Sequence, residues 1–499
     1  MIALFYILVI SLGVLTLIAR LLPREQAYLI SKREYAAAIY LPVVASFSPH
    51  YAVFGGLVIA FMAFIPATRE ERLRLFFFSL HLLPALSYTI TVPLQLITIN
   101  YYVLLALGCL SVVLSARPNL VARLRPWDVL VVLLIGGLVL AGVKDTSLTN
   151  GMRVVVGFTI ALGVPYLLVS RGTALTRSPT DLLLAVALGA TVVATITIFE
   201  SQRNWLLYDN FSHRFGITET NSAYAKQRAG YLRASTTFPE STSLSLFLSM
   251  ATIMLVALRS KFARPAVFWV MLGILLVAQV STFARVGLLA TAVGLLALLW
   301  HHRRYGLVIF TALAAPLLYT LLKLASESVP VLRAMFGETG EGASTIDYRS
   351  RLATRMYEEI LREPLFGLTP SQIQIRLDDM RQGEGIIDLV NAPLMIALQS
   401  GVVGLVAFLV PSIALIVWMV RMRRLKTSDE LTAIRAVFAC MIAFHAALIT
   451  TSFSGSHRMW MMVLIGLGAG LHAAHRSAVA RQRRAEPYLG PEPAASAAE

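Results

Sequence analysis

Arginines in two stretches of this sequence, 200–240 and 323–388, are the residues best suited to chemistry. The basic residues of these stretches are Arg203, Arg214, Lys226, Arg228, Arg233, Lys323, Arg333, Arg349, Arg351, Arg355, Arg362, Arg376 and Arg381. The planar guanidinium group matches phosphate oxygens with two parallel hydrogen bonds and keeps its charge at any physiological pH. The two stretches therefore predict a binding site for a phosphate-bearing anion.

The later stretch contains a predicted helix over 347–363, because Asp347 suits an N-terminal cap and Pro364 follows the other end. One predicted face is apolar and consists of Leu352, Met356 and Ile360. A second stripe, spaced by four, three and four residues, consists of Arg351, Arg355, Glu358 and Arg362. This stripe is either a solvated face with its own ion pair or part of the anion site.

A transfer reaction at such a site also needs a base, and the candidates are carboxylates and histidines near the same stretches. Glu240 and Asp388 each lie where a long loop meets an apolar segment. Further candidates are Glu200, Glu219, Glu338, Asp347, His213 and His457. Each is alternatively a helix cap or an ion-pair partner. Arg285, in the segment 281–287 between two apolar runs, either extends its charge to the membrane surface or binds the anion.

Aromatic residues accompany the basic residues of the earlier stretch. They are Trp205, Tyr208, Phe211, Phe215, Tyr224 and Tyr231. Such residues form belts at membrane surfaces, and they equally provide flat platforms with polar tips for sugar rings. We expect the belt role for Trp205 and Tyr208 and saccharide recognition for the others, including Tyr231.

Other chemistries lack their sequence signatures. No phosphate-binding P-loop or dinucleotide fingerprint occurs, the outer stretches hold no spaced Asp-x-Asp pair, and Asp378 and Asp379 are adjacent. We therefore expect no metal and no cofactor. The net charge of +16 comes from residues scattered over short loops, which argues against a nucleic-acid partner.

The elements that must position these residues are membrane-spanning helices. The 499 residues are 57% hydrophobic and only 14% charged, and apolar runs recur along the chain. At about 20 residues a span, we expect an all-α polytopic protein with about 12–15 transmembrane helices. Most Lys and Arg residues lie in alternate short loops, which assigns those loops to the cytoplasm and the two long stretches to the opposite side.

These expectations divide the chain into an N-terminal transmembrane bundle (1–199), an outer loop (200–240), a C-terminal transmembrane region (241–475) that includes the outer loop 323–388, and a cytoplasmic tail (476–499). Two predicted spans, at 75–96 and 98–116, follow one another closely. The pair at 35–67 is short and contains Pro42 and Pro49, so a re-entrant hairpin is an alternative there.

Three motifs resemble the O-antigen polymerase/ligase superfamily, whose shared region is called the Wzy_C domain. The first is a basic helix ending in GluProLeuPheGly (363–367), followed by AsnAlaProLeuMetIleAlaLeuGlnSerGlyValValGlyLeu (391–405). The second is Ala284–Arg285–Val286–Gly287, and the third is the junction from Arg233 to Thr237–Phe238–Pro239. The resemblance covers about residues 230–410.

The resemblance implies a metal-independent glycosyltransferase of the bacterial inner membrane whose active site faces the periplasm. It implies that Arg285, with loop arginines such as Arg233, Arg351, Arg355 and Arg362, contacts the diphosphate of an undecaprenyl-linked oligosaccharide. Where ligases of the family carry His-Asn, this chain has Val390–Asn391. Asn391 then belongs to the substrate site, the histidine base is missing, and Asp388 is a possible substitute.

We therefore expect a polymerase of O-antigen or exopolysaccharide repeat units, working beside a chain-length regulator and other glycan-assembly proteins. Two alternatives stay open. One is an O-antigen ligase that transfers glycan to lipid A core or to protein. The other is a transporter or flippase for lipid-linked saccharides, which should place charge along a central cavity through several spans.

Overall fold

The chain is folded almost entirely into helices. A computed structural model describes residues 1–90, 97–114, 124–209, 211, 215, 227–228, 230–329, 332–333, 341–382, 385–423 and 428–485. The helical elements of the first half are α1 (Ile2–Leu21), η1 (Arg24–Leu29), α2 (Lys32–Phe47), α3 (Tyr51–Phe64), α4 (Arg69–Ser79), α5 (Tyr101–Gly108), α6 (Ser111–Leu114), α8 (Pro126–Gly142), α9 (Leu148–Phe158), η2 (Thr159–Gly163), α10 (Val164–Leu175) and α11 (Pro179–Arg203).

The second half contributes the rest. Its helical elements are α13 (Ser241–Ala257), η4 (Arg259–Lys261), α14 (Pro265–Ser281), α15 (Arg285–His301), α16 (Tyr305–Ala325), α18 (Glu341–Arg362), α19 (Pro370–Arg376), η5 (Asp378–Met380), α20 (Ala392–Met422), α21 (Asp429–Leu448) and α22 (Gly455–Ala485). Two small antiparallel hairpins complete the described structure. They pair β1 (Ser87–Ile90) with β2 (Ile97–Asn100), and β3 (Gln227–Arg228) with β4 (Tyr231–Leu232).

Six of the described helical stretches are long and apolar enough to cross a membrane. They are α1, α9–η2–α10 (Leu148–Leu175), α11, α16, α20 and α21. Six shorter apolar stretches accompany them: Tyr51–Phe64, Tyr101–Leu114, Pro126–Gly142, Ser241–Ala257, Pro265–Ser281 and Arg285–His301. The all-α class is thus confirmed, and the chain has the character of a multi-pass membrane protein. Among these six stretches α11 is the most deeply buried, since 83% of the residues in its 18-residue apolar segment lie inside the protein.

The predicted span over 75–96 is wrong. Helix α4 ends at Ser79, and the chain turns through Pro84 into β1, which pairs with β2. Proline ends a helix, and the β-branched residues of SerTyrThrIle and IleThrIleAsn favour extended backbone. Non-helical backbone at membrane depth is tolerated where protein surrounds it, and Leu83 and Leu86 of this turn are fully buried. The segment 35–67, by contrast, forms two separate helices, α2 and α3.

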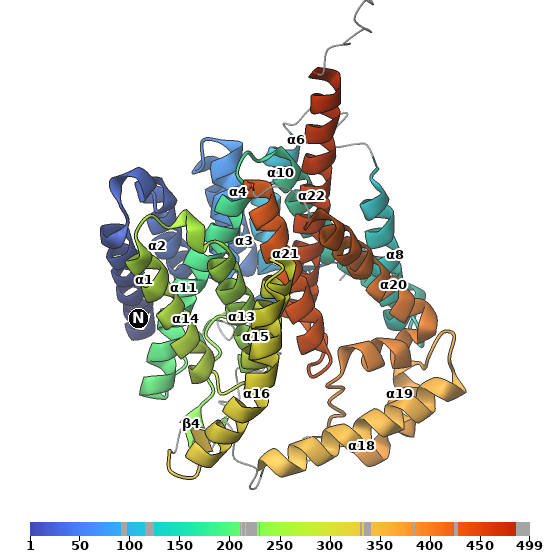
Figure 1. Ribbon diagram of the computed structural model, residues 1–499. Helices are drawn as coiled ribbons and strands as arrows, with labels where there is room; N and C mark the ends of the chain where they lie inside the picture. The colour runs from blue at the N-terminus through green and yellow to red at the C-terminus, as the bar shows by residue number, and fades with distance from the viewer. Residues whose placement is uncertain are drawn as a thin grey trace, which may run out of the picture.

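Figure 1 shows α18 and α19 at one end of the molecule, separate from the packed bundle, with β4 near the same end. The C-terminal part of α22 projects from the opposite end. We call residues 341–382, which comprise α18, the segment that follows it, α19 and η5, the cap. Its helix was predicted over 347–363, and α18 confirms it, although the helix begins earlier, at Glu341.

The cap has an apolar core of its own. Leu352 and Met356 are buried, and Ile360 packs beside them, which confirms the predicted apolar face. This face meets other buried residues of the cap and of α20, namely Leu368, Ile373, Leu377, Met380 and Leu398. Burial of such a cluster holds α18 against the N-terminal end of α20.

Two glycines allow the cap to dock closely on α20. Gly367 (φ +71°) and Gly401 (φ +63°) adopt left-handed backbone, and neither has room for a Cβ atom against the facing backbone. Across this contact the Leu368 N–H donates to the Leu398 carbonyl at 2.7 Å, and the Val402 N–H donates to the Pro364 carbonyl at 2.8 Å. The segments 363–367 and 391–405, which carry the family resemblance, therefore pack directly against each other.

Candidate functional site

The segment around Arg233 is held by a buried carboxylate at the end of α11. Glu200 Oε2 accepts the Thr236 N–H at 3.0 Å, and its Oε1 accepts the Leu207 N–H at 2.9 Å. Thr236 has left-handed backbone (φ +51°), and its hydroxyl lies 2.8 Å from that of Thr197. Glu200, a candidate base from the sequence, thus binds two backbone N–H groups and fixes the loop that carries Arg233.

The hairpin β3–β4 lies against the turn that precedes α15. Arg228 Nη1 donates to the Phe283 carbonyl at 2.9 Å, and the rings of Tyr231 and Phe283 stack with centroids 5.2 Å apart. Phe283 itself has left-handed backbone (φ +49°). The structure therefore brings together two motifs that are about fifty residues apart in the sequence. One ring face of Tyr231 is covered by this contact.

Arg285 is the first residue of α15. The carbonyl before it, from Ala284, accepts the Ser245 hydroxyl at 3.2 Å, and a Cβ atom at Gly287 would overlap the Ser245 side chain. Glycine at this position therefore lets α15 approach α13, which fixes the beginning of α15. This explains in physical terms the Ala284–Gly287 element noted in the sequence.

Arg233 lies in a positively charged setting. It is partly buried, and its Nε has no hydrogen-bond partner among the described residues. Burial, together with the charges of Arg228 and Arg349, lowers the pKa of Arg233 to about 10, while Glu240 acts in the opposite direction. The guanidinium stays protonated at neutral pH. A buried cation among other cations costs free energy unless an anion compensates it.

Arg349 also lies on α18, but it does not belong to the stripe of charged residues predicted from the sequence. It is exposed on the surface of the first half of α18, and its charge acts on Arg233. Arg233 and Arg349 therefore connect the two basic stretches of the sequence electrostatically. We call Arg228, Arg233 and Arg349, with Arg285 of the adjoining segment, the outer arginine cluster, after the side of the membrane on which the sequence predicts them.

The three stripe arginines contact carboxylates within the cap. Arg351 pairs with Asp347 at 3.1 Å, and Arg362 pairs with Glu359 at 2.6 Å. Arg355 is paired with Asp379 at 3.2 Å and Glu358 at 3.0 Å, and these carboxylates raise its pKa. Glu359 is buried and also binds Arg376 at 3.1 Å. The structure gives these arginines contacts that hold the cap together, as the alternative reading of the stripe expected, and their phosphate role stays a prediction.

The candidate bases differ in how their side chains are used. Glu240 begins α13, accepts the Thr242 hydroxyl at 3.1 Å, and belongs to the surroundings of Arg233. Asp388 is exposed, and its backbone N–H donates to the Tyr348 hydroxyl at 3.3 Å. Asn391 caps α20, since its side-chain oxygen accepts the Leu394 N–H at 3.1 Å. The remaining candidates His213, Glu219 and Glu338 lie outside the described residues.

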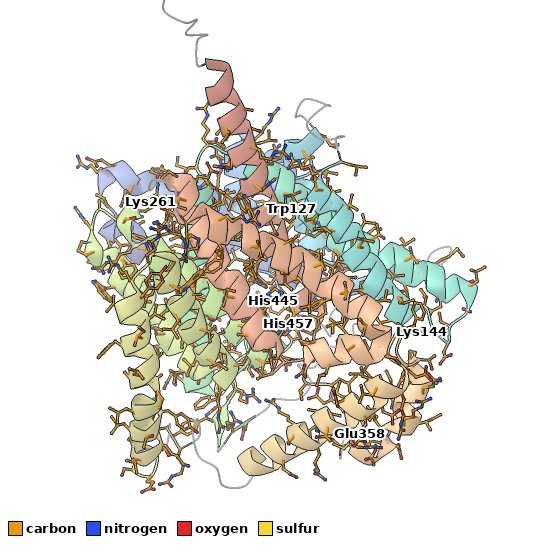
Figure 2. All side chains as sticks on the ribbon, turned by 45° about the vertical axis from the view of Figure 1, so that its right-hand side comes forward. Trp127, Lys144, Lys261, Glu358, His445 and His457 are labelled. Carbon is orange, nitrogen blue, oxygen red and sulfur yellow. The ribbon has the colours of Figure 1, made fainter. Side chains whose placement is uncertain are left out.

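His457 is buried and its Nδ1 lies 2.7 Å from the Ser454 hydroxyl. Figure 2 shows this residue in the interior of the bundle, far from Glu358 on the cap. A histidine held in this way within the packed bundle is suited to a structural role.

A cavity of about 300 Å³ lies beneath the cap, between α8, α19 and α20. Its walls are mostly apolar and include Ile387 and Leu389, the two neighbours of Asp388. Gln374, Gln399 and Arg458 supply polar groups. Lys144 lies where the cap joins the bundle (Figure 2), and its ammonium group donates to the carbonyls of Phe366, Gly367 and Gln399.

Two further observations bear on the class of chemistry. Among the described residues, no three His, Cys, Asp or Glu side chains gather into a possible metal site. No protein-family model matches the sequence, and no curated protein matches it. The superfamily resemblance therefore depends on the three motifs alone.

Proposed function

We propose that this chain is a glycosyltransferase of the bacterial inner membrane that works at the periplasmic face. In this proposal it spans the membrane about 12–15 times, and the cap and the 200–240 segment cover its outer end. It transfers a growing glycan from undecaprenyl diphosphate to a sugar hydroxyl of another lipid-linked unit. The product is an O-antigen or exopolysaccharide chain.

The observation that carries the proposal is the outer arginine cluster around Arg233. A partly buried guanidinium with an unpartnered Nε, next to further arginines, is stabilised by an anion that brings several oxygens. A diphosphate that leaves from a sugar develops negative charge on its oxygens. Arginines already in place stabilise that charge in the transition state.

In the reaction, the acceptor hydroxyl oxygen attacks the anomeric carbon of the donor sugar. The bond between that carbon and the diphosphate oxygen breaks, and the electron pair goes to the diphosphate. The hydroxyl proton goes to a carboxylate, for which Asp388 and Glu240 are the candidates. Neither a metal nor a cofactor is required by this scheme.

The two alternatives predict different products. A ligase would use the same donor site and transfer the glycan to lipid A core or protein. A flippase should carry charge through the middle of several spans. The cations of the outer arginine cluster lie instead near the beginning of α15 and the cap, which favours transfer chemistry.

A purified-enzyme assay tests the proposal. The full-length protein, given a polyprenyl-diphosphate oligosaccharide, should lengthen it, and Arg233→Gln should abolish lengthening. Arg233→Lys should also fail, because an ammonium group cannot bind two oxygens in parallel. Arg304→Gln, on an exposed residue that follows α15, is the matched control. Full activity of both Arg233 variants would refute the proposed donor site.

A deletion strain separates the alternatives. Loss of a polymerase should leave glycans of a single repeat, and loss of a ligase should leave long glycans on the carrier lipid. Loss of a flippase should trap single repeats on the cytoplasmic side.

A further inference from the structure

A second cavity opens between α9, the beginning of α22 and β2, away from the outer arginine cluster. Its volume is about 500 Å³. Two arginines line it: Arg153 from the middle of α9 and Arg458 from the first turn of α22. Asn100, Tyr102 and Asn150 add hydrogen-bonding groups to its wall. Neither arginine stood out in the sequence, because each lies within or at the edge of an apolar segment.

The positive charge in this cavity is uncompensated. Within the part of the chain that the structure describes, neither Arg153 nor Arg458 forms an ion pair with a carboxylate. Arg153 Nε is buried without a hydrogen-bond partner. Arg458 donates through Nε to the Phe453 carbonyl at 3.2 Å, and its guanidinium lies 5.1 Å from the Phe158 ring centroid. Ring faces and one carbonyl attract a guanidinium but do not neutralise it.

The rest of the cavity suits a hydrocarbon chain. Its wall includes Val154, Phe158, Ala161 and Leu162 of the α9–η2 segment. That segment is part of a candidate span, and its exposed side chains Leu148, Met152 and Val155 are apolar. A ligand that fits both features has a multiply charged anionic head and an apolar tail.

This cavity also adjoins the one beneath the cap. Phe158 and Arg458 line both of them. A molecule whose head is bound by Arg153 and Arg458 can thus place whatever is attached to that head towards the cap. There, Ile387 and Leu389 flank the candidate base Asp388.

We propose that Arg153 and Arg458 bind the diphosphate of a second lipid-linked molecule, which serves as the acceptor. This inference depends on the proposed function, since it assigns the two basic sites to the two substrates of one reaction. A polymerase of lipid-linked units uses two polyprenyl diphosphates, whereas a ligase uses one. The second site therefore favours the polymerase.

The test is a binding measurement on the purified full-length protein in a neutral detergent, with farnesyl diphosphate as the probe and calorimetry as the readout. The wild-type protein and the control Arg304→Gln should bind two molecules. The double variant Arg153→Gln/Arg458→Gln should bind one, and Arg233→Gln should bind the other one. The Lys pair, Arg153→Lys/Arg458→Lys, keeps the charge for folding and should weaken one of the two sites by about tenfold.

Three results would overturn the inference: one bound molecule in the wild-type protein that the double Gln variant still binds, two in the double Gln variant with an unchanged melting temperature, or no weakening in the Lys pair. Equal displacement of the probe from this site by phosphatidylglycerol would also overturn it, because the site would then take any anionic lipid. Inorganic diphosphate should bind more weakly than farnesyl diphosphate, and equal binding would refute the role of the tail. If only Arg233→Gln leaves the stoichiometry unchanged, the proposed donor site fails and the second site stands.

Discussion

The carboxylate of Glu200 binds the Thr236 N–H at 3.0 Å, and this contact fixes the loop between Arg233 and the beginning of α13. We expect Glu200→Gln to destabilise the protein, because the amide NH₂ group cannot accept the second backbone N–H. A buried donor without a partner costs about 1–3 kcal/mol. The measurement is thermal unfolding of the purified protein, together with hydrogen exchange of residues 230–239.

The matched control is Thr197→Val, which removes the hydroxyl next to the Thr236 hydroxyl but leaves both backbone acceptors in place. It should lower the melting temperature less than Glu200→Gln. If the two variants melted alike, the carboxylate would not be what holds the loop.

The helical class and the cap helix were predictable from the sequence, because both depend on periodic apolar residues. Leu352, Met356 and Ile360 indicated the buried face of α18 correctly. Hydropathy did not exclude a span over 75–96, because the turn after α4 and the strand β1 are made of residues as apolar as those of a helix. The positive φ of Gly367 and Gly401 likewise depends on how the cap meets α20, which is a tertiary contact.

The candidate site was predictable only in part. Arg233, Arg285 and Tyr231 come together, since the Tyr231–Phe283 stack joins their segments. Helical spacing pointed to Arg351 rather than Arg349 as a phosphate-binding residue. Spacing along a helix does not tell which face of that helix lies near another segment of the chain, here the one that carries Arg233. Arg153 and Arg458 acquire meaning only when α9 and α22 are seen to line one cavity.

We expect Arg233 to lower the stability of the ligand-free protein, although it is needed to bind the proposed anion. Its pKa is lowered to about 10, well below the ordinary value of an arginine in an unfolded chain. The protonated group therefore destabilises the ligand-free fold at neutral pH, and this penalty is lost as the pH rises through the folded-state pKa. We expect Arg233→Met to raise the free energy of unfolding by up to about 3 kcal/mol while abolishing transfer.

The measurement is the melting temperature at pH 7 without substrate, and Arg304→Met provides the comparison at an exposed position. If Arg233→Met melted at a lower temperature than the wild-type protein, Arg233 would not be a destabilising cation that an anion compensates.

Arg349 and Arg351 are neighbours on α18 with different surroundings. The charge of Arg349 acts on Arg233, whereas Arg351 is paired with Asp347 on an exposed surface. We expect Arg349→Ala to lower the transfer rate more than Arg351→Ala, because only Arg349 belongs to the outer arginine cluster. Transfer assays at equal protein concentration would show the order. A larger loss in Arg351→Ala would return the donor site to the stripe predicted from the sequence.

Acid should loosen the cap through Asp145. Asp145 lies in the turn between α8 and α9. Its carboxylate accepts a hydrogen bond from the Ser371 hydroxyl of α19, and this hydrogen bond lowers the pKa of Asp145. The contact thus contributes stability above the ordinary carboxylate pKa, and the contribution is lost as the pH falls through the folded-state value. The protection of residues 364–376 against hydrogen exchange, corrected for the intrinsic pH dependence of exchange, should fall below about pH 4 in the wild-type protein. In Asp145→Asn this protection should already be lower at pH 7, and equal protection there would exclude the contact as part of the docking of the cap.

Asp388 and Asn391 are close in sequence, but we expect their substitutions to change different properties, the catalytic rate for Asp388 and the stability for Asn391. Asn391 caps α20 through the Leu394 N–H, so Asn391→Ala should lower stability by about 1 kcal/mol. Asp388 is exposed, and its backbone N–H donates to the Tyr348 hydroxyl. We expect Asp388→Asn to lower kcat by about a hundredfold or more, as loss of a general base does. Glu240→Gln is the parallel test of the other candidate.

The transfer rate of the wild-type protein should rise with pH through the pKa of whichever carboxylate is the base, and that limb of the profile should vanish only in the matching variant. If neither variant changed kcat, the proton would have to leave through a group other than these two carboxylates.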